Sequence, residues 1–504
     1  MKNIRTLWDK CSKEFGTLTA IRWLEKKDIK EISYKELDVA ATTIRKGLFT
    51  EGYSGDHIAL IGTSSVYWMQ CYLGITTGDN VAVPLDVNLP AEDLIDLINR
   101  SDSKALFVSP KLVGFADKVK ESCPGVKDIW FLEEEALSLL KGSGMGADDV
   151  EGRGESDIAT IIFTSGTTGK SKGVMLTQAN LVSNVEAVQY TVEPGRTLLS
   201  VLPIHHAFCL VMDWLKGFSL GAVVCINDSF LHMVRNMSIF KPEVMLMVPL
   251  MIESIYKRLA AAGPDIPAKV LAQNVFGGNL RIIFTGGAHL DPYYIEKFAE
   301  YGVDVLEGYG MSECSPVISS NTPSDHKAGS IGRPLPNVEI KFENGEILVR
   351  GSSVMKGYYK MPDETDATLK DGWLHTGDKG YIDEDGFLFI NGRVKNLIIL
   401  SNGENISPEE IENKLALSPL VAEVIVTGEN NGLTARIYPE KEIAEAKGMD
   451  ADAVRDAIQG FVDEYNKIQP TYRQITSLII RENPFVRNAT SKIIRAKVLE
   501  DIPA

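Results

Sequence analysis

The sequence predicts an α/β fold with a large N-terminal domain and a small C-terminal domain. Apolar runs of strand length alternate with helical patterns along most of the 504 residues, and the pattern changes near residue 393. A chain of this length exceeds one ordinary core, and alternating strands and helices form parallel sheets covered by helices. We therefore expect layered βα sheets in residues 1–393 and a smaller α+β domain in residues 394–504.

The N-terminal region shows the alternation most clearly. Residues 8–60 predict helices followed by a strand, residues 66–78 a helix, and residues 81–85 a short buried strand. Residues 91–109 repeat the order of helix and strand. Parallel sheets bind ligands at the carboxyl ends of their strands. Residues 133–157 are acidic and glycine-rich, which is typical of a solvated loop.

Further strand patterns follow this loop, each ending in turn residues or a helix. In the N-terminal domain they lie at residues 197–204, 221–226, 243–249 and 281–287, and in the C-terminal domain at residues 396–401, 422–428 and 476–482. The segment 451–468 has a helical pattern. Ser407, followed by Pro408 and Glu410, is a capping-box pattern that predicts the start of another helix.

Charge and composition restrict the class of protein. The net charge of −16 argues against a nucleic-acid-binding surface or a polybasic membrane anchor, since both need clustered cations. No apolar stretch approaches the roughly 20 residues of a membrane-spanning helix, and the N-terminus has no signal-peptide pattern. The six cysteines include no CxxC pair. We expect a soluble cytoplasmic protein with free thiols and no transmembrane segment.

A glycine-rich stretch, TSGTTGKSKG at residues 164–173, follows the apolar run at residues 158–163. Glycines let backbone N–H groups approach an anion, and hydroxyls and lysines add donors and positive charge. The P-loop of NTPases needs four residues between its glycines and a helix directly afterwards. Only two residues separate Gly166 from Gly169, and the helical pattern begins later. The stretch therefore predicts a polyphosphate site, suited to ATP, that is not a P-loop.

Two other motifs follow predicted strands. GGAHL at residues 286–290 and GYGMSE at residues 308–313 are either tight turns or a binding site. In the second interpretation glycine backbone and Tyr309 bind a flat adenine, Ser312 donates to phosphate, and Glu313 binds Mg²⁺. His205 and His206 follow another strand, without the third ligand that a metal site would need.

These motifs resemble those of the adenylate-forming superfamily, which includes acyl- and aryl-CoA synthetases, carrier-protein adenylation domains and beetle luciferases. The resemblance also rests on TGD at residues 376–378, GRVKN at residues 392–396 and NPFVRNATSKIIRAK at residues 483–497. The motifs occur in the expected order over nearly the whole chain. The resemblance implies that the C-terminal domain rotates about a hinge.

The resemblance implies a role for each matching residue. ATP or AMP binding is assigned to Thr164, Ser165, Gly166, Thr167, Thr168, Gly169, Lys172, Gly286, Gly287, Ala288, Tyr309, Gly310, Ser312, Asp378 and Arg393. Catalytic roles are assigned to Lys492, His206 and Glu313, with Glu313 also binding the metal. Lys395 falls at the hinge and Gly403 at the thiol channel. Lys492 would neutralise the charge that develops as a carboxylate attacks the α-phosphorus of ATP.

The implied activity is that of an AMP-forming acid–CoA ligase with ATP, Mg²⁺ and coenzyme A. Ser491, where most relatives have glycine, makes the last motif more similar to that of long-chain fatty acid–CoA ligases. Acetate-specific relatives have a tryptophan at the position of Gly310, so the glycine favours a substrate longer than acetate. Together with the resemblance of the last motif, this implies an apolar acid such as a medium- or long-chain fatty acid.

Three alternatives stay open. The acceptor of the acyl or aminoacyl group is a carrier-protein phosphopantetheine, the adenylate is oxidised as in luciferases, or the chain is a non-catalytic nucleotide-binding homologue. The presence of Lys492, Glu313 and Asp378 together argues against the last alternative, because a protein without catalysis has no chemical need for all three.

Overall fold

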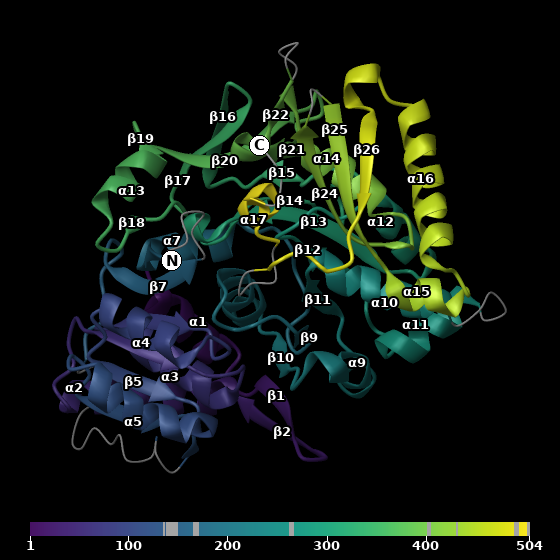
Figure 1. The fold of residues 1–504 in the computed structure, drawn as a ribbon. Helices are drawn as coiled ribbons and strands as arrows, with labels where there is room; N and C mark the ends of the chain where they lie inside the picture. The colour runs from purple at the N-terminus through teal and green to yellow at the C-terminus, as the bar shows by residue number, and fades with distance from the viewer. Residues whose placement is uncertain are drawn as a thin grey trace. The chain divides into compact units, whose positions relative to one another are not determined.

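The chain divides by its internal contacts into two units (Figure 1). The computed structural model describes residues 1–134, 137, 150–164, 171–261, 267–400, 405–429, 432–487 and 493–500. Unit 1 comprises Met1–Ile340 and Val349–Leu374, and unit 2 comprises Lys341–Leu348 and His375–Ala504. The predicted large and small α/β parts are confirmed. The hinge at Lys395, and with it a boundary after residue 393, stays a prediction.

Unit 1 contains a seven-stranded sheet with the strand order β18-β8-β7-β4-β3-β5-β6. Its strands are β3 (His57–Ile61), β4 (Val81–Leu85), β5 (Ala105–Val108), β6 (Asp128–Phe131), β7 (Ile158–Thr164), β8 (Lys172–Thr177) and β18 (Gly357–Tyr358). The strands from β7 to β6 are parallel, whereas β8 and β18 are antiparallel to their neighbours. The linking helices are α3 (Val66–Thr76), α4 (Ala91–Arg100) and α5 (Val113–Ser122). The predicted parallel βα alternation is therefore confirmed.

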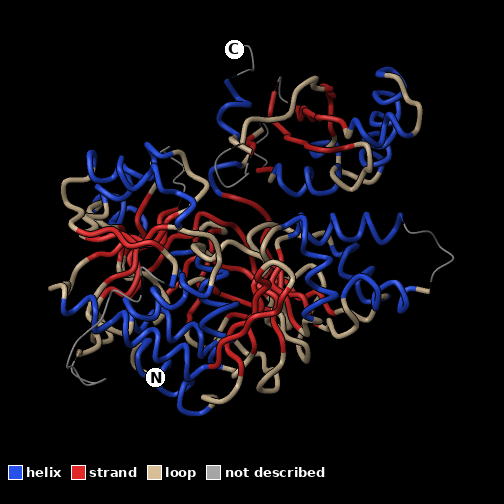
Figure 2. The backbone as a smooth tube through the Cα atoms, turned by 90° about the horizontal axis from the view of Figure 1, so that it is seen from below, coloured by secondary structure: helices blue, strands red, loops and turns tan. Residues whose placement is uncertain are grey.

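Unit 1 also contains a nine-stranded sheet with the order β15-β14-β13-β12-β11-β9-β10-β1-β2. Its strands are β1 (Thr19–Glu25), β2 (Asp28–Ser33), β9 (Thr197–Ser200), β10 (Val223–Ile226), β11 (Val244–Met247), β12 (Ile282–Thr285), β13 (Asp304–Gly310), β14 (Val317–Ser320) and β15 (Arg333–Pro334). The strands from β13 to β1 are parallel, and β2, β14 and β15 are antiparallel. Helices flank the strands of both sheets (Figure 2).

The remaining helices of unit 1 connect or cover these strands. They are α1 (Ile4–Glu14), α2 (Tyr34–Thr50), α7 (Gln178–Ala187), α8 (Lys216–Ser219), α9 (Met233–Phe240), α10 (Pro249–Ala261), α11 (Ala268–Phe276), α12 (Pro292–Glu300) and α13 (Pro362–Thr368). The sequence prediction missed the β1–β2 hairpin between α1 and α2. Most of β2 is exposed and charged, so it lacks the apolar alternation that signals a strand.

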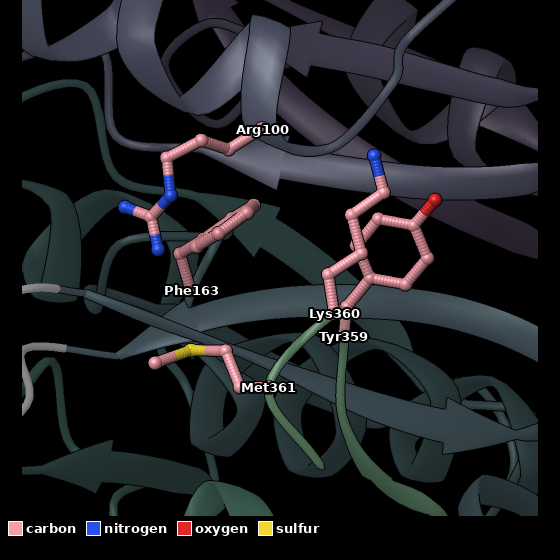
Figure 3. A pocket seen from close by; sticks show the side chains of 5 residues that line it. All are labelled: Arg100, Phe163, Tyr359, Lys360 and Met361. Carbon is pink, nitrogen blue, oxygen red and sulfur yellow. The ribbon is translucent and has the colours of Figure 1, made fainter. Parts of the chain in front are cut away.

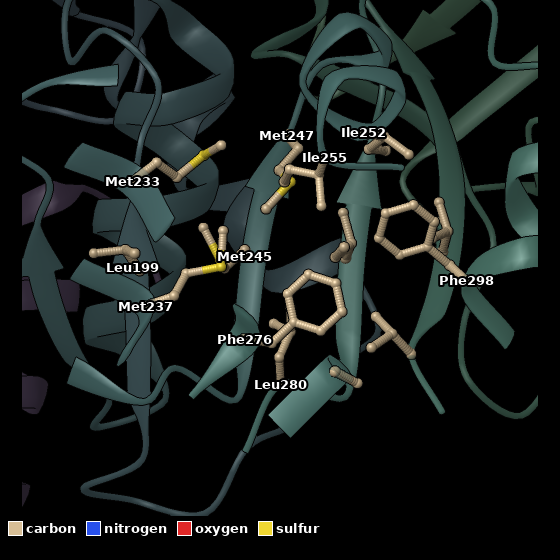
Figure 4. Packing of buried hydrophobic residues seen from close by; sticks show 14 of the residues in the cluster. Leu199, Met233, Met237, Met245, Met247, Ile252, Ile255, Phe276, Leu280 and Phe298 are labelled. Carbon is tan, nitrogen blue, oxygen red and sulfur yellow. The ribbon is translucent and has the colours of Figure 1, made fainter. Parts of the chain in front are cut away.

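The core around β11 explains the methionine-rich segment at residues 243–251. Met245 and Met247 are fully buried and pack with Phe276 and Phe298 from α11 and α12 (Figure 4). Met251 packs against the same cluster from α10. These methionines fill the space between sheet and helices, which is the ordinary role of an adaptable apolar side chain.

Unit 2 has a three-stranded sheet with the order β24-β25-β26, formed by β24 (Val421–Glu429), β25 (Gly432–Pro439) and β26 (Ile475–Ile480). Its helices are α14 (Pro408–Leu415), α15 (Lys441–Ala446), α16 (Ala451–Lys467) and α17 (Arg495–Glu500), and β22 (Ile398–Ile399) pairs with β23 (Asn405–Ile406). The unit boundaries fall within β16 (Val338–Glu343), β17 (Glu346–Gly351) and β20 (Trp373–Ile382); β19 (Leu369–Lys370) belongs to unit 1 and β21 (Leu388–Arg393) to unit 2. The predicted helix at residues 451–468 is confirmed.

Helix α14 begins at Pro408, as predicted, but without the predicted capping box. The Ser407 side chain makes no capping hydrogen bond. Its Oγ donates instead to Glu409 Oε2 at 3.0 Å, and Glu410 forms an ion pair with Arg473. Both side chains of the pattern are therefore engaged elsewhere.

Among the described residues, no helix has the length and apolar character needed to cross a bilayer.

Candidate active site

The predicted phosphate-binding stretch lies at the junction of two antiparallel strands. Strand β7 ends at Thr164, which pairs in register with Lys172 at the start of β8. Ser165, Gly166, Thr167, Thr168 and Gly169 lie outside the described residues. Helix α7 begins only after β8, at Gln178. A strand follows the stretch directly, which distinguishes it from the strand–loop–helix order of a P-loop.

Lys172 is held beside this junction by two partners in unit 1. Its ammonium forms an ion pair with the carboxylate of Glu364 on α13. The same nitrogen lies 5.0 Å from the centroid of the Tyr358 ring, within the range of a cation–π contact. Only 13% of the Lys172 side chain is exposed. The ammonium predicted to contact phosphate therefore has a defined position.

Glu313 lies at the other end of the Tyr358 side chain. It follows β13 in a short turn, Ser312–Cys314, and is buried. Its Oε1 accepts a hydrogen bond of 2.8 Å from the Tyr358 hydroxyl, and its backbone oxygen accepts one of 2.8 Å from Met355. Burial, reinforced by the Glu313 charge, raises the pKa of the Tyr358 phenol. Tyr358 therefore stays protonated and donates to the carboxylate.

Glu313 fits the kind of metal site predicted for it. Mg²⁺ is usually bound by one or two carboxylates together with substrate phosphates and water, not by a protein cage. Among the described residues, no group of three His, Cys, Asp or Glu side chains could hold a metal ion by itself. A single oriented carboxylate near a phosphate-binding stretch meets the needs of an ion that arrives with its nucleotide.

The two motifs predicted to bind adenine lie on adjacent strands. GGAHL follows β12, GYGMSE begins in β13, and Thr285 pairs in register with Glu307. A side chain at Gly286 would place its Cβ 3.0 Å from the oxygen of Gly308, and Gly287 has a φ of +83°. The close approach of Gly308 therefore favours glycine at position 286, and the left-handed backbone favours it at position 287. Tyr309 is buried in β13. Because β12 and β13 are parallel neighbours, their carboxyl ends lie side by side, and the predicted residues there are Gly286, Gly287, Ala288, Tyr309, Gly310 and Ser312.

Glu307 is a buried carboxyl near the carboxyl end of β13, and no sequence motif identified it. Burial is the largest cause that raises its pKa, to about 8, against hydrogen bonds from the backbone of Leu290 and Gly329. Its Oε2 has no hydrogen-bond partner among the described residues. At neutral pH this carboxyl is mostly protonated, and it can therefore donate as well as accept.

The interpretation of Gly310 as an opening to a larger acyl pocket stays a prediction, because the backbone gives this glycine a second explanation. A Cβ at this position would lie 2.1 Å from the oxygen of Pro316, because β14 crosses close to it. Gly310 pairs with Val317, and Met311 N donates to Pro316 O at 2.9 Å. Close approach of the two strands explains the glycine, so its presence does not measure the size of a substrate.

His205 and His206 lie just before a π-helix, Phe208–Leu215. Their ring centroids are 4.3 Å apart, and His205 Nε2 lies 3.7 Å from Asp86 Oδ2. Burial, followed by the neighbouring His206, lowers the pKa of His205 to about 4. His205 is therefore neutral at physiological pH. His206 is less buried than His205, and its role beside the acid substrate stays a prediction.

The π-helix carries a second buried acid, Asp213. Its Oδ2 accepts a hydrogen bond of 2.9 Å from Ser200, whereas Oδ1 has no partner among the described residues. Burial raises the pKa of Asp213 to about 7, and burial lowers that of nearby Lys216 to about 8. π-helical turns of this kind are frequent at functional sites. No sequence motif marked these two buried titratable groups, which follow the histidines in the chain.

Asp378 and Arg393, the predicted ribose contacts, come together within unit 2. They pair in register on β20 and β21, and Arg393 Nε donates to Asp378 Oδ1 at 2.7 Å. Asp378 is buried, whereas Arg393 is half-exposed. Lys395 lies in the next turn, Val394–Asn396. Gly403 and Lys492 lie outside the described residues, so their roles stay predictions.

A cavity of about 200 Å³ lies beside the phosphate-binding stretch (Figure 3). It is lined by Arg100, Phe163, Tyr359, Lys360 and Met361. The Arg100 guanidinium lies 5.8 Å from the Phe163 ring centroid and donates to the oxygen of Ser171 at 2.6 Å. Phe163 comes directly before the stretch at residues 164–173 and Ser171 lies within it, so Arg100 links the cavity to described residues at both ends of the stretch.

Three residues of this region were missed by the sequence analysis: Arg100, Tyr358 and Glu364. Arg100 ends α4, where a cation is ordinary, and so gave no signal. Tyr358 and Glu364 belong to KGYYKMPDETD, a turn and a short helix without periodicity. Proline at the start of α13 was a usable signal for that helix, but not for its contact with Lys172.

Comparison with known protein families agrees with this arrangement. Residues 8–359 match the AMP-binding enzyme family, and residues 395–502 match the AMP-binding enzyme C-terminal domain. The chain belongs to the family of AMP-binding enzymes. The second match begins at Lys395, the residue predicted at the hinge.

Relatives of this AMP-binding enzyme include CoA ligases for different acids. Long-chain-fatty-acid–CoA ligase 5 of Rattus norvegicus is 30% identical over 82% of this chain and 71% of its own length. Indoleacetate–CoA ligase of Aromatoleum aromaticum is 29% identical, with 89% of both chains covered. The crystal structure of the anthranilate CoA ligase AuaEII with anthranoyl-AMP matches with a TM-score of 0.84, 19% identity and coverage of 99% and 96%. The last comparison shows the fold alone.

Proposed function

We propose that this AMP-forming acyl-CoA synthetase, an acid–thiol ligase, activates an apolar carboxylic acid, such as a medium- or long-chain fatty acid, and transfers it to coenzyme A. The observation that carries the proposal is the convergence of Lys172 and Glu313 on Tyr358. A cation for phosphate and a carboxylate for Mg²⁺ are what an adenylating enzyme must hold close together. Relatives named for fatty and indole acids support an apolar substrate.

The first half-reaction is adenylation. An oxygen of the substrate carboxylate attacks the α-phosphorus of ATP, the bond between the α-phosphorus and the bridging oxygen breaks, and pyrophosphate leaves. Lys172 neutralises charge on the phosphates, and Lys492 neutralises the charge that develops at the α-phosphoryl group. Glu313 would hold Mg²⁺, which when bound neutralises and orients the leaving phosphates.

Other residues bind and orient the substrates in this scheme. Asp378 accepts hydrogen bonds from the ribose hydroxyls, and Arg393 orients that carboxylate through the 2.7 Å hydrogen bond already present. Tyr309 stacks on the adenine between the glycine turns. His206 lies beside the acid, with neutral His205 behind it.

The second half-reaction forms the thioester. The sulfur of CoA attacks the acyl carbonyl carbon, AMP leaves with the bonding electrons, and the thiol proton passes to solvent. Residues 394–504 rotate about Lys395 between the two steps, bringing Gly403 to the thiol channel. Six buried free thiols support a reducing compartment such as the cytoplasm.

The proposal is tested by acid-dependent exchange of labelled pyrophosphate into ATP, over a panel of fatty, aryl and amino acids, with and without Mg²⁺. Exchange is expected with apolar acids and only in the presence of Mg²⁺. Amino acids are expected to give none. Exchange restricted to amino acids would contradict the proposed substrate class, and equal exchange without divalent metal would contradict the role of Glu313.

A further inference from the structure

The ion pair between Lys172 and Glu364 involves the lysine that is also proposed to bind the phosphates of ATP. Glu364 lies on α13, 192 residues away in the chain, and its carboxylate contacts the Lys172 ammonium directly. The Lys172 side chain is 13% exposed and that of Glu364 is 35% exposed. The pair is therefore partly shielded from water, so its attraction is screened less than that of a surface pair.

Tyr358 gives the pair its fixed geometry. The ring face lies against the Lys172 ammonium, and the hydroxyl at the far end of the ring is anchored by Glu313. The backbone of Tyr358 is tied to the same helix as Glu364, because its N–H donates to Thr365 Oγ1 at 2.9 Å. Lysine, tyrosine and α13 therefore form one connected unit, and Glu364 is the anion placed within it.

A lysine ammonium has three donors, but its charge is shared among the anions around it. A phosphate approaching Lys172 meets the Glu364 carboxylate as a like charge and as a competitor for the same donors. Either the carboxylate moves away or the two anions repel each other at close range. Both outcomes reduce the affinity of Lys172 for the phosphate.

We propose that Glu364 is the counter-ion of Lys172 while no nucleotide is bound. The phosphates of ATP displace Glu364 from the lysine, and the ion pair forms again when pyrophosphate leaves. The inference rests on the proposed role of Lys172 as a phosphate contact. Glu364 thereby weakens the binding of ATP and of pyrophosphate, and it keeps the ammonium oriented while the site holds neither. It leaves the affinity for AMP unchanged, since AMP lacks the phosphates beyond the α position.

The test compares Glu364→Gln with wild type by calorimetric titration of Mg-ATP, pyrophosphate and AMP. Glutamine keeps the shape and one acceptor but removes the charge. We expect ATP and pyrophosphate to bind about fivefold more tightly, the factor expected for a partly screened ion pair. AMP affinity should not change, and the gain should diminish in high salt. Unchanged or weaker binding of ATP and pyrophosphate would overturn the proposal.

Asp366→Asn is the matched control, because Asp366 is an exposed acid on the same helix. It removes the same charge at a distance from the ion pair and should leave all three affinities within a factor of about two. An equal gain in this control would mean that general charge, and not the pair, is responsible, and would overturn the proposal.

Wild-type titration separates this inference from the proposed function. If wild type binds no ATP, or if Lys172→Ala binds it as tightly as wild type, the proposed role of Lys172 fails and the inference fails with it. If wild type binds ATP through Lys172 and Glu364→Gln binds it no better, only the counter-ion role is refuted.

Discussion

Replacing Asp213 with asparagine should change the pH dependence of stability in a direction that its burial determines. The carboxyl is fully buried on the π-helix, and only Oδ2 has a hydrogen-bond partner among the described residues. Burial raises its pKa from an ordinary value of 3.8 to about 7. Between these two values the folded protein holds a proton that the unfolded chain has lost. Stability from this group is therefore full at low pH and is lost as the pH rises towards 7.

The magnitude follows from the shift in pKa. About three pKa units at about 1.4 kcal/mol each amount to roughly 4 kcal/mol, of which about 3 kcal/mol falls between pH 5 and pH 8. The asparagine side chain of the variant does not titrate, so Asp213→Asn should gain this amount relative to wild type across that interval. Urea unfolding followed by tryptophan fluorescence at pH 5, 6, 7 and 8 measures the difference.

The control is Asp117→Asn, because the Asp117 side chain is 76% exposed and pairs only with exposed Lys120 among the described partners. Its stability difference from wild type should stay within about 0.5 kcal/mol at every pH. If the stability curves of Asp213→Asn and wild type run parallel from pH 5 to pH 8, the carboxyl is ionised in the folded protein and the reasoning from burial is wrong.

The other predictions concern the site itself. Burial lowers the pKa of His205 to about 4, so as the pH falls from 6.5 to 4 the unfolded chain takes up a proton before the folded protein does, and wild type should lose about 3 kcal/mol of stability. His205→Asn should not show this loss. Urea unfolding over that pH range measures the difference. Tyr358→Phe should destabilise the protein by about 2 kcal/mol and weaken Mg-ATP binding, because buried Glu313 loses the hydrogen bond from the phenol; calorimetry with and without Mg²⁺ checks it, and unchanged binding would contradict the role of that bond. Lys492→Ala should abolish acyl-AMP formation but still convert preformed acyl-AMP and CoA to thioester; equal loss of both half-reactions, measured separately, would refute its assignment.

Local patterns in the sequence were sufficient to predict most of the fold. Apolar runs bounded by turn residues predicted β3, β4 and β5 and, in the second sheet, β9, β10, β11 and β12, because parallel strands buried on both faces leave a continuous apolar signal. The β1–β2 hairpin was missed because β2 is exposed at the edge of its sheet and reads as a polar loop. At Ser407 the predicted capping hydrogen bond does not form, because the side chains of the pattern have other partners.

The candidate site was predicted only where its residues follow one another in the chain. The glycine-rich stretch and GYGMSE are local signatures, and the structure places them at strand ends as expected. The contact of Lys172 with Glu364 and that of Glu313 with Tyr358 join distant segments of the chain, so no local sequence pattern could predict them. The steric reason for Gly310 was missed for the same cause, because the strand that approaches this glycine is visible only in three dimensions.

The most direct test of the proposed function is mass spectrometry of the products formed from ATP, Mg²⁺ and an apolar acid, before and after addition of CoA. The account predicts acyl-adenylate and pyrophosphate in the first sample, and acyl-CoA with stoichiometric AMP in the second. An acyl-adenylate that CoA does not consume would contradict the assignment of coenzyme A as the acceptor. Formation of ADP or an acyl phosphate in place of AMP would contradict the adenylation mechanism itself.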